Sequence, residues 1–206
     1  MKKALIVQGG WEGHQPAQVA DFLAGELRAH GLNVTISDTL DSFKDPDLGR
    51  LDLIVPVWTM GTIARDQLDG LLNAVRGGVG FGGLHGTCDA FRNETDYQFL
   101  VGGQFVAHPG GDGTTYTVFI DGAPSPITDD LDDFSVTSEQ YYLHVDPGNT
   151  VLATTRFGDV VMPVAWTRMY GKGRVFYCSL GHTVEVIRAP QARALIVNGL
   201  LWAAGE

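Results

Sequence analysis

The chain has 206 residues, of which 44% are hydrophobic and 18% are charged, with 14 Lys and Arg against 24 Asp and Glu. A chain of this length buries roughly 70% of its unfolded surface as one compact domain, and its ordinary apolar content excludes a disordered or fibrous protein. The net charge of −10, with no basic cluster, argues against a nucleic-acid partner.

Targeting and membrane signals are absent from the sequence pattern. The first apolar stretch, at residues 4–7, is too short for a secretory signal, and no run approaches the roughly 18 apolar residues of a membrane span. The two cysteines form no C-x-x-C pair, so they indicate neither a disulfide scaffold nor a cysteine zinc site. We therefore expect a cytoplasmic protein with no membrane partner.

The first 90 residues alternate short apolar runs with amphipathic segments. Apolar runs that end at glycines predict buried strands, and apolar residues at helical spacing predict the segments between them as helices. The predicted elements are strands at residues 4–7, 32–36, 51–58 and 79–84, and helices at residues 16–30 and 68–77. This β-α-β-β-α-β order predicts a parallel sheet with helices over both faces.

The second half of the chain is less regular. Residues 86–113 predict a short helix and a long glycine-rich loop, and residues 114–120 alternate as an antiparallel or edge strand does. Further elements are strands at residues 151–156, 160–166 and 174–179, a turn at 170–173 and a C-terminal helix at 192–203. No repeat, linker or change of composition interrupts the chain, so we expect a single domain over residues 1–206.

Ligands of an open parallel sheet bind beyond the carboxyl ends of its strands, so the loops that follow strands are the first candidates for a site. The loop after the first strand, residues 9–14, brings Trp11, Glu12 and His14 together among glycines. It lacks the G-x-G-x-x-G pattern of dinucleotide-binding proteins. We interpret it as a functional loop, with a tight turn and a solvent-facing histidine as the structural alternative.

A second candidate loop, residues 82–89, surrounds His85 with small residues. These permit a sharp strand-to-helix turn that exposes the histidine over the sheet, as a nucleophile elbow does. A histidine bonded to backbone is the structural alternative. Cys88 follows at the start of a helix, where a thiol pKa falls, although a small buried cysteine is the simpler interpretation.

Two further places carry candidate residues. His108 precedes a proline that fixes extended backbone and presents the imidazole to one side. Glu139 lies close to the aromatic pair Tyr141 and Tyr142, and a carboxylate beside aromatic rings favours a sugar. Two tyrosines that alternate in and out along a strand are the structural alternative. His182 follows a predicted strand end, and Glu185, three residues later, could orient it as a general base.

These segments resemble the trehalose-utilisation (ThuA-like) family, a branch of the class I glutamine amidotransferase-like superfold. The resembling segments are residues 9–14, 83–86, 102–109 and 139–142 and, most specifically, residues 163–182. The resemblance implies a three-layer α/β/α flavodoxin-like fold with a mostly parallel sheet. It also implies a role in the catabolism of trehalose and its keto derivatives.

The chain departs from glutamine amidotransferases at two positions. Those enzymes carry a cysteine nucleophile at the elbow, where this chain has His85. They also place a His and a Glu two residues apart before the last helix, whereas His182 and Glu185 are three apart. Both departures argue against glutamine hydrolysis.

Our leading hypothesis is an enzyme that acts on a disaccharide or its 3-keto form as a hydrolase, lyase or isomerase. Proton transfer beside a carbonyl needs a base of near-neutral pKa, which histidine supplies. The expected catalytic residues are His85 as base or acid, His182 as its partner and Glu139 on the sugar hydroxyls. The expected carbohydrate-binding residues are Trp11, His14, Trp58, His108, Tyr141, Trp166 and Arg168.

Three alternatives remain open. No cofactor is expected, but zinc or another divalent metal is an alternative, because the loop residues are suitable ligands although no H-x-x-x-H spacing occurs. Those residues are His14, His85, His108, His182 and Glu139. The second alternative is a non-catalytic sugar-binding or regulatory module, and the third is an amidase that uses Cys88. The expected partners are a small carbohydrate and, as a homo-oligomer, a second copy of the chain.

Overall fold

A computed structural model describes residues 1–205 and places a seven-stranded sheet at the centre of the protein. Its strand order is β2-β1-β3-β4-β11-β10-β9. The strands are β1 (Lys3–Gly10), β2 (Asn33–Ser37), β3 (Leu53–Thr59), β4 (Gly80–Leu84), β9 (Thr150–Phe157), β10 (Val160–Tyr170) and β11 (Gly173–Cys178). The five strands from β2 to β11 pair in parallel, and β10 and β9 complete the sheet in antiparallel pairing.

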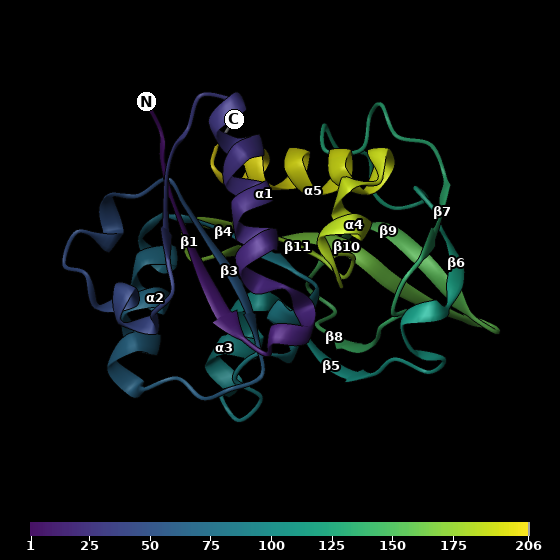
Figure 1. Cartoon of the computed structure of the whole chain (residues 1–206), viewed down its shortest axis with the longest axis horizontal. Helices are drawn as coiled ribbons and strands as arrows, with labels where there is room; N and C mark the ends of the chain where they lie inside the picture. Colours follow the sequence, from purple (N-terminus) through teal and green to yellow (C-terminus); the bar gives the residue numbers. More distant parts are fainter. Residues whose placement is uncertain (206) are drawn as a thin grey trace.

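Helices cover both faces of this sheet. They are α1 (Pro16–Ala29), α2 (Arg65–Gly77), α3 (Thr95–Val101), α4 (Val184–Arg188) and α5 (Pro190–Ala203). Side chains of α1, α4 and α5 share one hydrophobic core with the sheet, and those of α2 and α3 share the other. Within β1 the alternation is strict, because Ala4 and Ile6 enter the first core while Leu5 and Val7 enter the second. The sheet between its two helical layers confirms the predicted three-layer fold (Figure 1).

Two small antiparallel sheets extend the fold beside β9 and β10. One pairs β5 (Gly103–Ala107) with β8 (Tyr142–Val145), and the other pairs β6 (Thr115–Val118) with β7 (Phe134–Thr137). Figure 1 shows these four strands gathered at one side of the molecule. The sequence predicted β6 but not β5, β7 or β8, because strands of four or five residues carry too few alternating positions to stand out.

Short 3₁₀ helices make several of the connections. They are η1 (Glu12–His14), η2 (Leu40–Lys44), η3 (Leu48–Arg50), η4 (His85–Asp89) and η5 (Gly111–Gly113). Two of them, η2 and η3, join β2 to β3, so this crossover lacks an α-helix, as the predicted β-β order indicated. Within residues 1–205 no helix combines the length and the apolar character that crossing a bilayer requires.

Candidate functional site

Four candidate loops meet at the carboxyl edge of the sheet. His14 lies in η1 after β1, His85 follows β4 directly, and His182 follows β11. Glu139 lies between β7 and β8 and joins them from the small sheets. One potential ligand atom from each of these four residues lies within 4.8 Å of the others. The convergence predicted from parallel strand order is therefore confirmed.

The elbow at His85 is present, but its side chain points into the protein. The backbone of His85 is left-handed, with φ of 40°, and Gly86 behind it leaves room for the neighbouring chain. A side chain at Gly86 would collide with the Thr59 hydroxyl and lie 3.1 Å from His14 Nδ1. Tyr141 stacks on the His85 ring at 4.1 Å between centroids, so His85 is only 2% exposed. The expected exposure over the sheet is wrong, because this tyrosine covers the ring.

Three histidines direct a ring nitrogen at the same oxygen of Glu139. His85 Nε2 lies 3.1 Å and His182 Nδ1 lies 3.3 Å from Glu139 Oε2. His14 Nε2 lies 3.7 Å from that oxygen. The other carboxylate oxygen, Oε1, lies 3.7 Å from Nε2 of His108, a more exposed histidine at the edge of the group. We call His14, His85, Glu139 and His182 the histidine–glutamate cluster.

The second nitrogen of two cluster histidines is held by the surrounding structure. His85 Nδ1 donates to the carbonyl oxygen of Ser179 at 2.8 Å, and His14 Nδ1 lies 2.8 Å from the hydroxyl oxygen of Thr59. Both rings are therefore fixed in orientation with Nε2 turned toward Glu139. The backbone of the elbow is held as well, since the Tyr177 hydroxyl donates to the His85 carbonyl oxygen at 2.8 Å.

Burial and charge set the protonation states of the cluster. Burial lowers the pKa of His85 to about 4, so the imidazole is neutral at pH 7. Burial by itself raises the pKa of Glu139. Hydrogen bonds from the surrounding histidines lower it by more than burial raises it, so the pKa lies well below its ordinary value. The cluster thus presents an ionised carboxylate to a neutral His85.

A pocket of about 170 Å³ opens onto His14 and Glu139. Three further predicted residues line it: Trp11, His108 and Tyr141. Trp11 is 46% exposed and meets the His14 ring edge-on, so a flat aromatic surface stands at the mouth of the pocket. Such a pocket combines apolar walls with a few polar groups, as small-molecule sites do.

Sequence reasoning missed four residues that line the same pocket: Met60, Asp89, Arg92 and Phe105. Asp89 is buried and accepts a hydrogen bond from Arg92 Nε at 2.6 Å. Burial raises the pKa of Asp89, and the charge of Arg92 opposes that shift. The i, i+3 spacing of this pair directly after the elbow is the one signal that could have indicated it.

Three predicted carbohydrate-binding residues do not line the pocket. Trp166 lies in the core with no exposed surface, and its Nε1 donates to the carbonyl oxygen of Val101 at 2.9 Å. Arg168 pairs with Asp146 at 3.2 Å. Trp58 packs near Phe91, with ring centroids 6.3 Å apart. These side chains support the sheet and its loops, and we leave them out of the proposed site.

The expected pairing of His182 with Glu185 is also wrong. Glu185 is exposed and accepts a hydrogen bond from Arg188 at 2.9 Å, because the short helix α4 carries its side chain outward. The carboxylate next to His182 belongs instead to Glu139, which lies 43 residues earlier in the chain.

Cys88 is a buried structural residue, as the simpler interpretation held. It has no exposed surface, and burial raises the pKa of its thiol far above the ordinary value. A nucleophilic cysteine needs a thiolate and access to substrate. The structure therefore gives no support to an amidase that uses Cys88.

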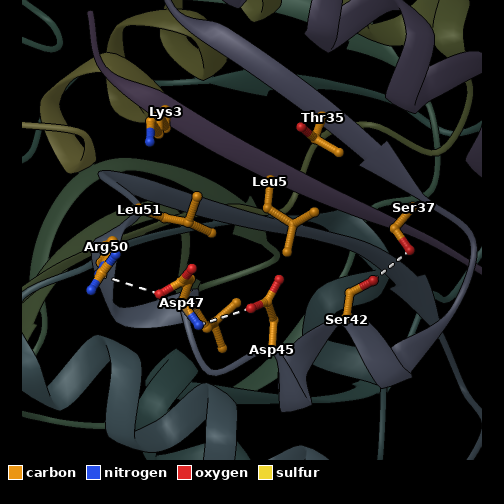
Figure 2. Close-up of a pocket in the computed structure, with 10 residues that line it drawn as sticks. Lys3, Leu5, Thr35, Ser37, Ser42, Asp45, Asp47, Arg50 and Leu51 are labelled. Carbon is orange, nitrogen blue, oxygen red and sulfur yellow. Dashed lines mark hydrogen bonds and ion pairs between the residues drawn. The ribbon is translucent and has the colours of Figure 1, made fainter.

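A second hollow of about 280 Å³ lies against β1 and β2 and shares no lining residue with the pocket. Figure 2 shows that its polar groups bond to one another: the Ser42 hydroxyl donates to Ser37, and Arg50 pairs with Asp47. The hollow exists because 3₁₀ turns, rather than a helix, cover this part of the sheet. None of the predicted site residues lines it.

Solved structures with the same fold cover nearly the whole chain. A ThuA-like protein from Bacteroides uniformis is 20% identical with a TM-score of 0.80, over 98% of this chain and 91% of that one. A cytoplasmic protein of Salmonella typhimurium is 15% identical with a TM-score of 0.72, over 98% and 99% of the two chains. A β-galactosidase from Rahnella is 17% identical with a TM-score of 0.62, over 86% of this chain but only 28% of its own.

The β-galactosidase match fits the class I glutamine amidotransferase-like fold, as the resemblance implied. At these low sequence identities the structural matches show the fold alone. No curated protein matches the chain by sequence. The family described as "ThuA: Trehalose utilisation" matches residues 3–203. Because this match spans almost the entire chain, the protein belongs to the ThuA family of trehalose utilisation.

Proposed function

We propose that this ThuA-family protein is an enzyme that acts on a disaccharide or its 3-keto derivative, with the histidine–glutamate cluster as its reacting centre. One observation carries the proposal: ring nitrogens of His85 and His182 converge on the Glu139 carboxylate at the floor of an accessible pocket. Acid–base and electrophilic chemistry both need such polar groups concentrated where water is largely excluded.

The pocket suits a sugar ring. Trp11 offers an apolar face at the mouth, and Arg92 with Asp89 offers hydrogen-bond donors and acceptors on the wall. The volume of the pocket, about 170 Å³, is below the roughly 300–1,000 Å³ of most ligand pockets. We therefore expect one ring of a disaccharide to enter the pocket and the other to lie outside it, against Trp11.

Proton transfer to the sugar falls to His108. Its side chain is 42% exposed and lines the pocket, whereas His85 is fully covered by the protein. An imidazole that substrate can reach can act as a general acid or a general base. His14 and Glu139 line the pocket and meet the sugar oxygen that enters it, and His85 and His182 act behind them by holding the Glu139 carboxylate.

Proton NMR of the purified protein with trehalose and, separately, with 3-keto-trehalose tests the proposal. Wild type and the control variant His144→Ala, altered at an exposed position of β8, should convert one of these sugars. His85→Ala and His108→Ala should lower the rate by about 100-fold or more, as loss of a catalytic group does. Line broadening of the sugar without product, in wild type as in the variants, would show a binding module and overturn the proposal.

A further inference from the structure

Ring nitrogens of the cluster histidines point at one carboxylate oxygen. His85 Nδ1 donates to the carbonyl oxygen of Ser179 at 2.8 Å, so Nε2 is the nitrogen that faces Glu139 Oε2 at 3.1 Å. An imidazole held on one nitrogen, with the other turned toward a buried carboxylate, has the arrangement of a metal ligand.

The other two histidines of the cluster also direct a ring nitrogen at Glu139 Oε2. With Nδ1 of His14 held at Thr59, its Nε2 is the atom left for Glu139. His182 Nδ1 is buried and has no hydrogen-bond partner among the described residues, although Glu139 Oε2 lies 3.3 Å away. A buried polar atom without a partner costs about 1–3 kcal/mol, so His182 Nδ1 needs a partner that the described residues do not supply.

The distances from Glu139 Oε2 to the three nitrogens fit a metal ion as that partner. Two ligands bound at about 2.1 Å to a tetrahedral zinc lie roughly 3.4 Å apart. The three nitrogen-to-Oε2 distances, 3.1, 3.3 and 3.7 Å, lie on either side of that value. Histidines that bind metals also anchor their second nitrogen on a backbone or side-chain oxygen, as His85 and His14 do here.

We propose that the histidine–glutamate cluster is a divalent transition-metal site, with His14, His85, His182 and Glu139 as ligands. Three imidazoles and one carboxylate suit zinc, cobalt, manganese or iron, whereas magnesium and calcium prefer ligand sets made only of oxygen. Binding of the ion rests on the donor geometry, and its use in catalysis rests on the proposed function.

A metal at this position would separate the residues that bind the ion from the residue that transfers protons. Because His14 and Glu139 also line the pocket, the side of the cluster that faces the pocket is where a sugar oxygen would be polarised. His85 and His182 then serve as ligands, and proton transfer stays with His108, whose Nε2 faces the other oxygen of Glu139 at 3.7 Å.

Metal titration of the untagged protein, stripped by a chelator, tests the site without any measurement of activity. Dialysis against Zn²⁺ or Co²⁺ followed by elemental analysis should give about one ion per chain, and Co²⁺ should show the visible bands of a low-coordinate site. Glu139→Gln keeps the shape of the side chain and should weaken binding by about 100-fold or more, and so should His182→Ala. The control His144→Ala should bind as wild type does.

The outcomes separate this site from the proposed function. Less than about a tenth of an ion per wild-type chain, at metal concentrations that saturate ordinary zinc proteins, would overturn the site. Unchanged affinity in a Glu139→Gln variant that keeps the wild-type circular dichroism would overturn it as well. A bound ion without turnover of either sugar leaves the site standing and removes the enzyme proposal. Full turnover by the stripped protein would keep the enzyme proposal and remove the ion from the catalytic step.

Discussion

At Gly86 the space that a side chain needs is already occupied. An added Cβ would collide with the Thr59 hydroxyl, the group that holds the His14 ring. Gly86→Ala should therefore lower the free energy of unfolding by about 1–3 kcal/mol and turn His14 away from Glu139. Gly25→Ala is the matched control, because nothing lies within 4 Å of that position in α1, and it should stabilise the protein by about 0.5–1 kcal/mol. Denaturant unfolding of both variants measures the difference, and a Gly86→Ala variant as stable as wild type would contradict the packing described.

Cys88 lies one turn beyond the same elbow, yet the structure keeps it from reacting. Burial raises its thiol pKa and leaves no exposed surface, and Cys178 is equally buried. Native protein treated with iodoacetamide should stay unmodified by intact mass spectrometry, while both thiols react in denaturant. Rapid modification of the native protein at Cys88 would show an open form of the elbow that the structure does not contain.

The predicted residues that the structure brings together share one sequence signal: each follows a strand or lies between strands. His14, His85 and His182 follow β1, β4 and β11, where parallel topology places ligands. Trp166, in contrast, lies within β10, and this sheet is covered on both faces. Alternation along such a strand cannot tell which face meets a ligand, so the sequence could not show that Trp166 is in the core.

Among the elements, the turn from β4 into η4 depends most on its neighbours. In residues 1–205 the four non-glycine residues with left-handed backbone are Gln15, Met60, His85 and Phe91. Three of them are at the site, because Gln15 follows His14, Met60 lines the pocket and His85 belongs to the cluster. Such conformations each cost on the order of 1 kcal/mol and persist only where the surroundings impose them. No sequence pattern reports this for Gln15, Met60 and Phe91, because none of these residue types favours the conformation, as glycine, asparagine, aspartate and histidine do.

β11 imposes the elbow through Tyr177, whose hydroxyl donates to the His85 carbonyl oxygen at 2.8 Å. Tyr177→Phe keeps the ring and its packing on Trp166 but leaves that buried carbonyl without its donor. We expect a loss of about 1–3 kcal/mol in the free energy of unfolding, with weaker metal binding as the elbow relaxes. Tyr142→Phe, at a partly exposed ring of β8, is the control. Equal stability and equal metal affinity in the two variants would show that the elbow holds without β11.

At the scale of the molecule, the order of elements in the first half determined where the site would be. A β-α-β-β-α-β pattern can bury its apolar faces only as a parallel sheet, and its carboxyl ends then meet at one edge. The position of Glu139 could not be derived in this way. Glu139 lies between β7 and β8 of the small sheets, whose strands are too short and whose connections are too long to be predicted from the sequence pattern.

The cluster joins segments that are distant in the chain, so a bound ion should stabilise the whole fold. Its four ligands come from the ends of β1, β4 and β11 and from the β7–β8 connection. An ion that binds only the folded state, at 100 times its dissociation constant, adds about 2.7 kcal/mol. For a chain of this length that corresponds to a rise in Tm of about 5–10 °C.

Differential scanning calorimetry with Zn²⁺ should show this rise in wild type and a much smaller one in Glu139→Gln. Mg²⁺ should have little effect on either protein, because it disfavours imidazole ligands. A rise of the same size with Mg²⁺, or with Zn²⁺ in Glu139→Gln, would mean that the ions stabilise this acidic protein elsewhere than at the histidine–glutamate cluster.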